Sequence, residues 1–446
     1  MNSATDSKRF FIHTLGCKVN QYESQAMREI LLKAGFKECP SINMADIYIL
    51  NTCTVTQAAD RESRHTIGLF HRTNPNAKIV VSGCYAERNA DDISFLPGVE
   101  HILKNSEKNR IAEVLDDTPR SALRALRSAP SREPLFITDF KDHTRAFVKI
   151  QDGCENACAY CKVPLVRGRL KSRSLEDVLR EVRGLVDKGF REIVLTGICL
   201  GAWGKDFDST MVAEGVGLTG LALVDILIAL RKVEGDFRVR LSSIEPKYII
   251  DDLIELMSKD ERICRHLHIP LQSGDDEILA RMNRPYTALD YKMLIERIRG
   301  KIEDIAITTD VLIGFPGESE SNFKNTLAFL KEIGPARTHI FTFSKREGTA
   351  AYEMRDEVGK DIARMRYYRL NAASLAASYI YRRKFLNEKL DVLVETKRTR
   401  RAGLLTGYSG NYIKVLFEGP DELMGKTVPV RIEGLTLLHT VGGYDG

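Results

Sequence analysis

Residues 145–161 read RAFVKIQDGCENACAYC, and this stretch decides the fold of the central part of the chain. Its first six residues form an apolar run of strand length, and the loop that follows carries three cysteines. Five further short apolar runs follow, separated from one another by helical patterns: EIVLTG, FRVRLSS, HLHIPL, AITTDVLIGF and RTHIFTFS. Six strand–helix units are too few for a complete eight-fold barrel. The sequence therefore predicts a partial parallel (β/α)6 barrel, with its chemistry at the C-terminal ends of the strands.

The chain on either side of this barrel follows two other patterns. From residue 9 to about residue 115, short apolar runs alternate with amphipathic segments, which predicts a doubly wound parallel sheet. After residue 387 the apolar period changes to two over five short runs, which predicts a small antiparallel β-barrel. The expected fold class is therefore α/β with a C-terminal β-barrel. The domains are expected at residues 8–118, 139–376 and 377–441, with a linker at 119–138.

Composition and charge limit the class of protein. The chain has 446 residues, and its 43% of hydrophobic and 28% of charged residues exclude wholesale disorder and a coiled coil. Its formal charge of +5 permits a nucleic-acid partner without arguing for one. The longest apolar stretch, residues 218–230, is too short to span a bilayer, and the first residues lack a secretory leader. We therefore expect a cytoplasmic protein without membrane contact, whose cysteines are reduced.

The three cysteines of the opening stretch form the pattern C-x3-C-x2-C at Cys154, Cys158 and Cys161. Three thiolates in one short loop can share an iron–sulfur cluster and leave one iron without a protein ligand. That iron can chelate S-adenosylmethionine, whose cleavage by an electron from the cluster gives a radical. The alternative is a zinc site, which needs a fourth ligand in a closed site. No further cysteine or histidine follows nearby to provide it.

Three more cysteines lie far apart in the first predicted domain. Cys17, Cys53 and Cys84 each follow the C-terminal end of a predicted parallel strand by a few residues. Such strand ends share one edge of an open α/β sheet, so we expect the three thiols to converge there. The alternative is three ordinary buried cysteines. The sharper interpretation is a second cluster with its own open iron, which could hold sulfur.

The other cysteines fit neither set. Cys39 and Cys264 lie between elements or at a helix end, and we interpret both as structural. Cys199 follows a barrel strand and could line the site, but packing is favoured.

Short motifs at the barrel mouth are candidates for the S-adenosylmethionine site. Thr196 and Gly197 end one strand, Gln272 lies at the end of another, and GFPGE forms a strand-to-helix turn. The candidate cofactor-binding residues are Thr196, Gly197, Gln272, Gly314, Gly317 and Glu318. The alternative for each is an ordinary turn, since glycine is common where strands pass into helices.

Two basic segments are candidates for phosphate contacts. Arg167 and Arg169 follow the cysteine loop closely, and four more basic residues share one predicted turn of the C-terminal barrel. These four are Lys397, Arg398, Arg400 and Arg401. Either segment could instead be a solvated loop.

These motifs together resemble those of a known family. TLGCKVNQYES, LNTCTVT, VSGCYAE, GCENACAYCKVP and VRGRLKSR are similar to the motifs of the radical S-adenosylmethionine methylthiotransferases. The resemblance implies an N-terminal domain with an auxiliary 4Fe-4S cluster, a central domain with the radical-generating 4Fe-4S cluster, and a C-terminal TRAM-type barrel that contacts the substrate. Carried over to this sequence, Cys17, Cys53 and Cys84 match the auxiliary-cluster ligands. Cys154, Cys158 and Cys161 match the ligands of the radical-generating cluster.

One segment bears on the substrate. GCKVNQYES resembles the branch of the family that modifies N6-threonylcarbamoyladenosine beside the tRNA anticodon. The isopentenyladenosine branch has a GCQMNEYDS-like sequence at this position, and the branch that acts on a ribosomal-protein aspartate has a GCPKN-like sequence. The resemblance therefore implies a tRNA methylthiotransferase that inserts a methylthio group at carbon 2 of the base. The alternatives are the other two substrates or, without catalysis, a zinc-stabilised RNA-binding protein.

The resemblance also implies cofactors and partners. S-adenosylmethionine is expected as radical source and methyl donor, with a sulfur donor such as sulfide or polysulfide on the auxiliary cluster. The expected partners are tRNA and an electron donor such as flavodoxin or ferredoxin, and we expect a monomer. No catalytic residue is assigned beyond the two clusters.

Overall fold

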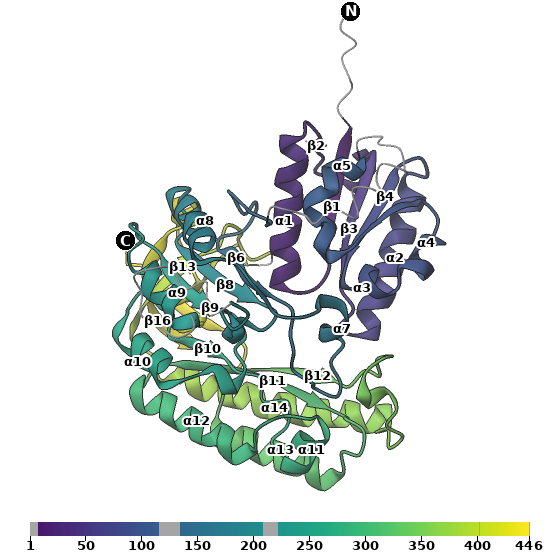
Figure 1. Ribbon diagram of the computed structural model, residues 1–446. Helices are drawn as coiled ribbons and strands as arrows, with labels where there is room; N and C mark the ends of the chain where they lie inside the picture. Colours follow the sequence, from purple (N-terminus) through teal and green to yellow (C-terminus); the bar gives the residue numbers. More distant parts are fainter. Residues whose placement is uncertain (1–7, 116–133, 208–221, 401, 446) are drawn as a thin grey trace, which may run out of the picture. The chain divides into compact units, whose positions relative to one another are not determined.

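The computed structural model describes residues 8–115, 134–207, 222–400 and 402–445 (Figure 1). The chain divides into two compact units. The first contains the described residues up to Lys141 together with Gly153–Glu155 and Cys161–Arg169. The second contains Asp142–Asp152, Asn156–Tyr160 and the described residues from Leu170 onward. Most of the predicted linker, the start of the longest apolar stretch and Arg401 lie outside the described residues.

The first unit is built on a five-stranded parallel sheet in the order β2-β1-β3-β4-β5. The strands are β1 (Arg9–Thr14), β2 (Lys37–Glu38), β3 (Ile47–Thr52), β4 (Lys78–Gly83) and β5 (Val99–Leu103). The helices are α1 (Lys18–Lys33), α2 (Gln57–Thr73), α3 (Cys84–Arg88), α4 (Ala90–Ser94) and α5 (Ile111–Leu115), with short 3-10 turns η1 (Ile42–Met44) and η2 (Asn105–Arg110). The small helix α7 (Val163–Arg167) also belongs to this unit.

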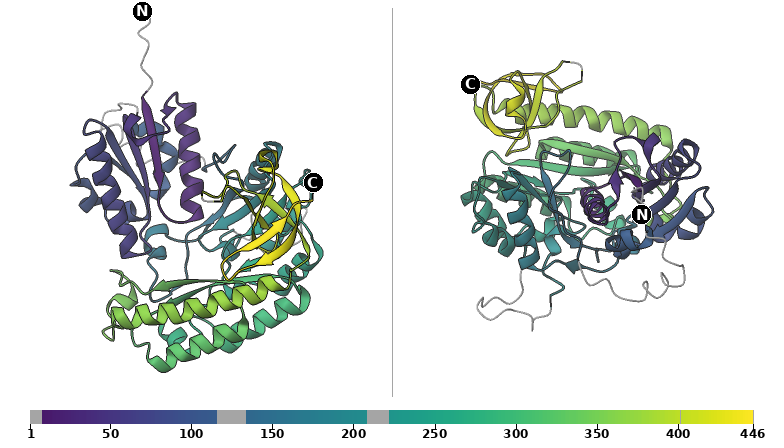
Figure 2. Two further views of the ribbon diagram at one scale, coloured as in Figure 1. Left: turned by 180° about the vertical axis from the view of Figure 1, so that it is seen from behind. Right: turned by 90° about the horizontal axis from the view of Figure 1, so that it is seen from above.

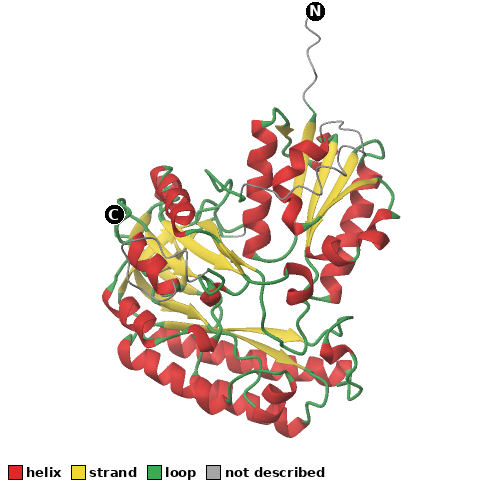
Figure 3. Cartoon of the chain, in the orientation of Figure 1, coloured by secondary structure: helices red, strands yellow, loops and turns green. Residues whose placement is uncertain are grey.

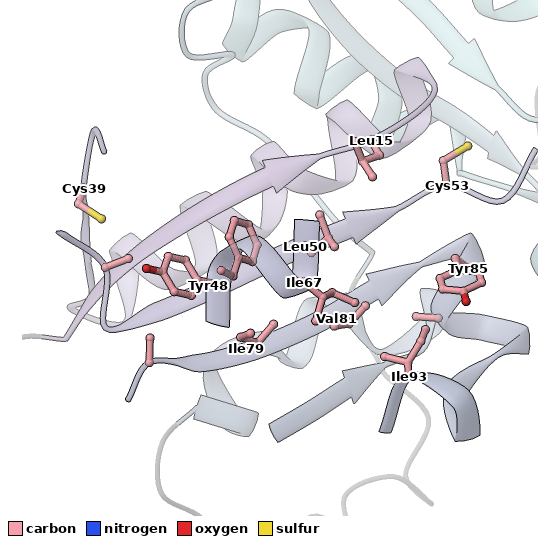
Figure 4. Close-up of a cluster of buried hydrophobic side chains, with 14 residues drawn as sticks. Leu15, Cys39, Tyr48, Leu50, Cys53, Ile67, Ile79, Val81, Tyr85 and Ile93 are labelled. Carbon is pink, nitrogen blue, oxygen red and sulfur yellow. The ribbon is translucent and has the colours of Figure 1, made fainter. Parts of the chain in front are cut away.

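Both faces of this sheet are covered by helices (Figure 2). Ile47 and Ile49 pack on the side of α1 and α5, while Tyr48 and Leu50 point to the other face. There Tyr48 stacks on Phe70 of α2 with ring centroids 4.5 Å apart. Figure 4 shows the core on this second face. Side chains that alternate between two buried faces confirm the predicted doubly wound sheet.

The second unit contains six parallel strands that follow one another in chain order. Figure 3 draws strands as yellow arrows and helices in red. They are β6 (Ala146–Asp152), β8 (Glu192–Gly197), β9 (Arg238–Leu241), β10 (His266–His268), β11 (Ala306–Ile313) and β12 (Arg337–Thr342). The short β7 (Lys171–Ser172) pairs antiparallel with β6. Bridges Val239–Ile263 and Ser243–His268 join the four-stranded and three-stranded sheets at β9 and β10. This is the predicted partial barrel.

Helices connect these strands and lead on to the C-terminal barrel. They are α8 (Leu175–Asp187), α9 (Leu223–Leu230), α10 (Asp251–Lys259), α11 (Asp276–Arg281), α12 (Ala288–Lys301), α13 (Glu320–Ile333) and α14 (Lys360–Arg383). The 3-10 turns are η3 (Leu200–Ala202), η5 (Pro246–Tyr248), η6 (Ala350–Tyr352) and η7 (Asp421–Leu423). Ser174, Thr287 and Ser319 cap α8, α12 and α13 by accepting a backbone N–H, which fixes where each of these helices begins. No helix of the described residues is long and apolar enough to cross a bilayer.

The C-terminal strands close into a five-stranded barrel in the order β13-β14-β15-β17-β16. They are β13 (Lys389–Val394), β14 (Leu405–Ser409), β15 (Lys414–Phe417), β16 (Thr427–Leu435) and β17 (Thr440–Gly443). Along β16, Val428, Val430 and Ile432 are buried, and the residues between them are exposed. This period of two places one row of apolar side chains inside the barrel and confirms the predicted architecture.

Candidate metal centres

The three distant cysteines of the first unit lie after neighbouring strands. Cys17 follows β1 and directly precedes α1, Cys53 follows β3, and Cys84 is the first residue of α3 after β4. Because β1, β3 and β4 are adjacent and parallel, their C-terminal ends meet at one edge of the sheet. Cys53 and Cys84 are buried, whereas Cys17 is exposed.

Two glycines bring the chain together at this edge. Gly16 and Gly83, each directly before a cysteine, have φ of +95° and +96°. A Cβ atom at Gly16 would lie 2.7 Å from the Cβ of Cys53, and one at Gly83 would lie 2.3 Å from the carbonyl oxygen of Thr52. Only glycine allows both the backbone angle and so close an approach. The segments that carry Cys17 and Cys84 are therefore pressed against the segment that carries Cys53.

Burial and neighbouring charges raise the pKa of two of these thiols. Burial raises the pKa of Cys53 to about 11, and the nearby thiols of Cys84 and Cys17 add to the rise. Burial also raises the pKa of Cys84, although the positive charges of Arg167 and Lys108 oppose it. Mutual repulsion between thiolates is what a shared metal centre relieves, because its ligands must be deprotonated. The cysteine trio therefore fits a cationic cluster.

A buried polar network surrounds Cys84. The Nε of Arg167 donates to Cys84 Sγ over 3.2 Å, Nη1 to Glu23 Oε1 over 2.6 Å and Nη2 to Asn20 Oδ1 over 2.6 Å. On its other side, Glu23 pairs with Lys108. The side chain of Arg167 is 1% exposed.

This burial bears on one sequence-based expectation. The guanidinium of Arg167 is enclosed and donates to Cys84, Glu23 and Asn20, so the structure gives no support to a tRNA contact at this residue, which stays a prediction. Arg169, two residues further on, is exposed as a phosphate contact requires.

The loop with the C-x3-C-x2-C pattern begins with a third Gly-Cys pair. Gly153 has φ of +73°, and a Cβ there would lie 1.8 Å from the carbonyl oxygen of Arg169. Next to it, the N–H of Cys154 donates to the carbonyl of Gly168 over 3.0 Å. The backbone after α7 thus holds the start of the loop.

In the second unit, an arginine side chain donates a hydrogen bond to Cys158. Nη1 of Arg284 donates to Cys158 Sγ over 3.1 Å, and Nε donates to the hydroxyl of Tyr286 over 3.0 Å. The same guanidinium pairs with Glu245 and is 1% exposed. Sequence reasoning missed this arginine, because it lies 126 positions from the cysteine and belongs to no local motif.

The loop around Cys158 is also fixed through its backbone. The N–H of Ala159 donates to the carbonyl of Met282 over 2.9 Å, and Nδ2 of Asn283 donates to the carbonyl of Ala157 over 2.7 Å. The segment after α11 therefore orients this part of the cysteine loop.

The predicted S-adenosylmethionine residues lie at the ends of β8, β10 and β11. Thr196 is buried, and a Cβ at Gly197 would approach Gln151 Oε1 to 3.0 Å. Gln272 has φ of +68°, and its N–H donates to the carbonyl of Asp310 over 2.8 Å. Like Gly314 and Gly317 after β11, these three residues remain candidates for cofactor contacts.

The carboxylate of Glu318 stabilises the turn that follows β11. Its carboxylate accepts from the N–H of Gly314 over 2.7 Å and from Arg366 Nη1 over 2.6 Å. The pKa of this carboxyl is raised by burial, although both partners oppose the rise. The carboxylate is thus engaged in holding the turn that contains Gly314 and Gly317.

The basic turn of the C-terminal barrel is only partly open to a ligand. Lys397 and Arg400 are exposed. Arg398, by contrast, donates to Asp421 over 2.7 Å and to the carbonyl of Gly419 over 2.7 Å. Arg401 lies outside the described residues.

Sequence reasoning also missed a pocket of about 450 Å³ in the second unit. It lies where β12, α14 and the C-terminal barrel meet. Arg337 and Lys414 line it beside the rings of Tyr408 and Tyr412, and none of the described residues that line it is acidic. Cations beside aromatic rings suit a nucleic-acid backbone and its bases.

No three His, Cys, Asp or Glu side chains in the described part of the chain are placed to hold a single metal ion. An iron–sulfur cluster distributes its ligands around several irons rather than one ion, and it uses cysteine thiolates.

Comparison with protein families gives three matches. Residues 9–103 match the uncharacterized protein family UPF0004, residues 148–330 match the Radical SAM superfamily, and residues 383–436 match the TRAM domain.

Full-length relatives carry two kinds of name. The chain is 38% identical to the threonylcarbamoyladenosine tRNA methylthiotransferase MtaB of Bacillus subtilis, over 94% of this chain and 92% of the relative. It is 37% identical to the protein of the same name from Thermotoga maritima, over 95% and 94%. It is also 33% identical to the tRNA-2-methylthio-N(6)-dimethylallyladenosine synthase of Carboxydothermus hydrogenoformans, over 98% and 99%.

Among solved structures, the fold is similar to that of the radical S-adenosylmethionine methyltransferase TsrM from Kitasatospora setae. The TM-score is 0.52 at 14% identity, and 75% of each chain is covered.

Proposed function

This chain belongs to the radical S-adenosylmethionine tRNA methylthiotransferases, and from that premise we propose that its substrate base is N6-threonylcarbamoyladenosine next to the anticodon. The product would be 2-methylthio-N6-threonylcarbamoyladenosine. Two observations support this substrate. First, relatives named threonylcarbamoyladenosine tRNA methylthiotransferase are 38% and 37% identical to this chain over nearly its whole length. Second, the GCKVNQYES segment at Cys17 resembles the branch of the family that modifies this base.

The chemistry of the reaction explains the cysteine loop. Carbon 2 of adenine bears an unactivated C–H bond, which acid–base groups cannot break. Bound S-adenosylmethionine and its 4Fe-4S cluster supply the hydrogen-atom abstractor that this bond requires. In this chain Cys154, Cys158 and Cys161 would hold that cluster, and Arg284 would orient the sulfur of Cys158.

The observation that supports the sulfur-inserting chemistry is that Cys17, Cys53 and Cys84 each follow a strand, and that the C-terminal ends of these strands meet at one sheet edge. We assign these residues to a second 4Fe-4S cluster with one iron free of protein ligands, the place for the sulfur that is transferred. Sulfide or polysulfide would supply that sulfur. Flavodoxin or ferredoxin would supply electrons, and the protein would act as a monomer.

Contacts to tRNA are proposed at exposed basic residues of both units. They are Arg169 after the cysteine loop, Lys397 and Arg400 in the C-terminal barrel, and Arg337 and Lys414 at the pocket beside it.

Two measurements test the proposal. Cells that lack the protein should lose 2-methylthio-N6-threonylcarbamoyladenosine from their tRNA, as seen by nucleoside mass spectrometry, and the gene should restore it. Loss of the methylthio group from isopentenyladenosine instead would reassign the substrate.

The second measurement is the iron content of anaerobically reconstituted protein. We expect about eight irons per chain, and about four in both Cys53→Ala and Cys158→Ala. Of the two variants, only Cys53→Ala should still cleave S-adenosylmethionine. About four irons in the unaltered protein would refute the second cluster.

A further inference from the structure

The guanidinium of Arg167 lies against the sulfur of Cys84 within the first unit, with its Nε 3.2 Å from Sγ. We propose that Arg167 is a positioning residue for the second cluster, which sets its reduction potential by donating to the Cys84 sulfur. This inference rests on the proposed function, because it requires a cluster at Cys17, Cys53 and Cys84.

The contact is built into the core of the unit. Nη1 and Nη2 of Arg167 donate to the two carboxylate oxygens of Glu23 over 2.6 and 3.1 Å, and Nη2 also donates to Asn20. The side chains of Arg167 and Glu23 are 1% and 0% exposed. Because these contacts fix the planar guanidinium group of Arg167, its Nε–H points toward the sulfur of Cys84.

A second cation stabilises this arrangement. Lys108 pairs with Glu23 and donates to Asn51 Oδ1 over 3.0 Å. Asn51 in turn donates to the carbonyl of Asn20 over 2.9 Å. The network therefore links α1, β3 and η2 to the arginine, and its geometry does not depend on a single contact.

Arg167 also belongs to the segment that carries a ligand of the other cluster. It is the last residue of α7, and Cys161 begins the same segment of the first unit. The side chain of Asn105 donates to the carbonyl of Val166 over 2.9 Å, which holds α7 beside η2. One short stretch of chain thus extends from a ligand of the radical-generating cluster to a donor for the second cluster.

The physical effect on a cluster has a definite sign. Hydrogen bonds to the sulfurs and nearby positive charge stabilise the reduced cluster, which carries more negative charge. Loss of the guanidinium should therefore lower the reduction potential of the second cluster.

The experiment isolates that cluster. In full-length protein with Cys154, Cys158 and Cys161 replaced by alanine, we would measure iron content, the EPR spectrum and the midpoint potential. Three variants are made in this background: Arg167→Met removes donor and charge, Arg167→Gln keeps a donor, and Arg167→Lys keeps the charge. Arg169→Gln is the matched control, since it removes an exposed arginine two residues away.

The expected result is a lower midpoint potential and an altered EPR spectrum in Arg167→Met. Smaller shifts are expected in Arg167→Gln and Arg167→Lys, and none in Arg169→Gln. If Arg167→Met does not fold or does not retain iron, the two milder variants decide. Full iron content with unchanged potential and spectrum in the folded Arg167 variants would overturn the inference. A parent protein that binds no cluster would overturn the proposed second cluster itself.

Discussion

At the scale of single residues, the close approach of backbone at the cysteine edge gives a test with an internal control. Gly35 and Gly83 both have positive φ, but a Cβ at Gly35 would meet nothing within 4 Å, whereas one at Gly83 would lie 2.3 Å from the Thr52 carbonyl. Gly35→Ala should cost about 1 kcal/mol of backbone strain. Gly83→Ala should lower the melting temperature further and reduce iron bound at Cys17, Cys53 and Cys84, because the Thr52–Cys53 segment must move. Equal melting temperatures and full iron in both variants would show that the contact is not needed.

The same scale shows what the sequence could predict of the site. Cys154, Cys158 and Cys161 are recognisable because their spacing is local. The Gly-Cys pairs at residues 16, 83 and 153 were a further local signal of close backbone approach, which the sequence analysis did not use. The arginines beside Cys84 and Cys158 are 83 and 126 positions away from them. Their roles depend on which side chains the fold buries together, and no local pattern encodes that.

At the scale of elements, a buried carboxylate links β8 to β9 beneath the C-terminal barrel. Glu192 accepts from Arg238 and Arg240 over 2.6 Å each, and Arg240 donates onward to the carbonyls of Ser409 and Gly410. Burial alone would raise the pKa of Glu192, but the two arginines outweigh it and lower the pKa from 4.5 to about 2. The stabilisation is therefore present above pH 4.5 and is lost as the pH falls toward 2.

Glu192→Gln should remove that pH dependence and leave the buried Arg240 and the partly buried Arg238 without their counter-charge. We expect a loss of roughly 3–5 kcal/mol near neutral pH. The melting temperature between pH 5 and pH 2 should also fall less steeply than in the unaltered protein. Parallel melting curves of the two proteins over this range would contradict the assignment. Glu255→Gln is the control, since Glu255 pairs with Lys259 at the surface and its loss should have little effect.

The elements themselves were largely predictable. The apolar runs became β6 and β8 to β12 because strands of a parallel sheet covered by helices are continuously apolar, although β12, at the edge of its sheet, is partly exposed. The period of two after residue 387 became a closed barrel. Closure of that barrel brings β15 beside β17 in a parallel pairing, which the sequence of neither strand predicts.

At the scale of the whole molecule, binding of a tRNA requires cations spread over a surface larger than any one motif. The turn at Lys397 and Arg400 was the expected contact in the C-terminal barrel, but its neighbour Arg398 is engaged with Asp421. Arg337 and Lys414 are exposed, come from β12 and β15, and line one pocket. Phosphate contacts release counterions, so each lost contact should reduce the salt dependence of binding by about one unit of slope.

The double variant Arg337→Ala/Lys414→Ala should therefore weaken tRNA binding and reduce the slope of log K against log salt concentration by about two. The same measurement on Lys397→Ala/Arg400→Ala shows whether the basic turn contributes to the same surface. Both variants should retain the iron content of the unaltered protein, because neither pair lies at a cysteine site. If the first variant binds tRNA with unchanged affinity and slope, the pocket is outside the footprint, and the exposed cation Arg169 of the first unit becomes the next residue to replace.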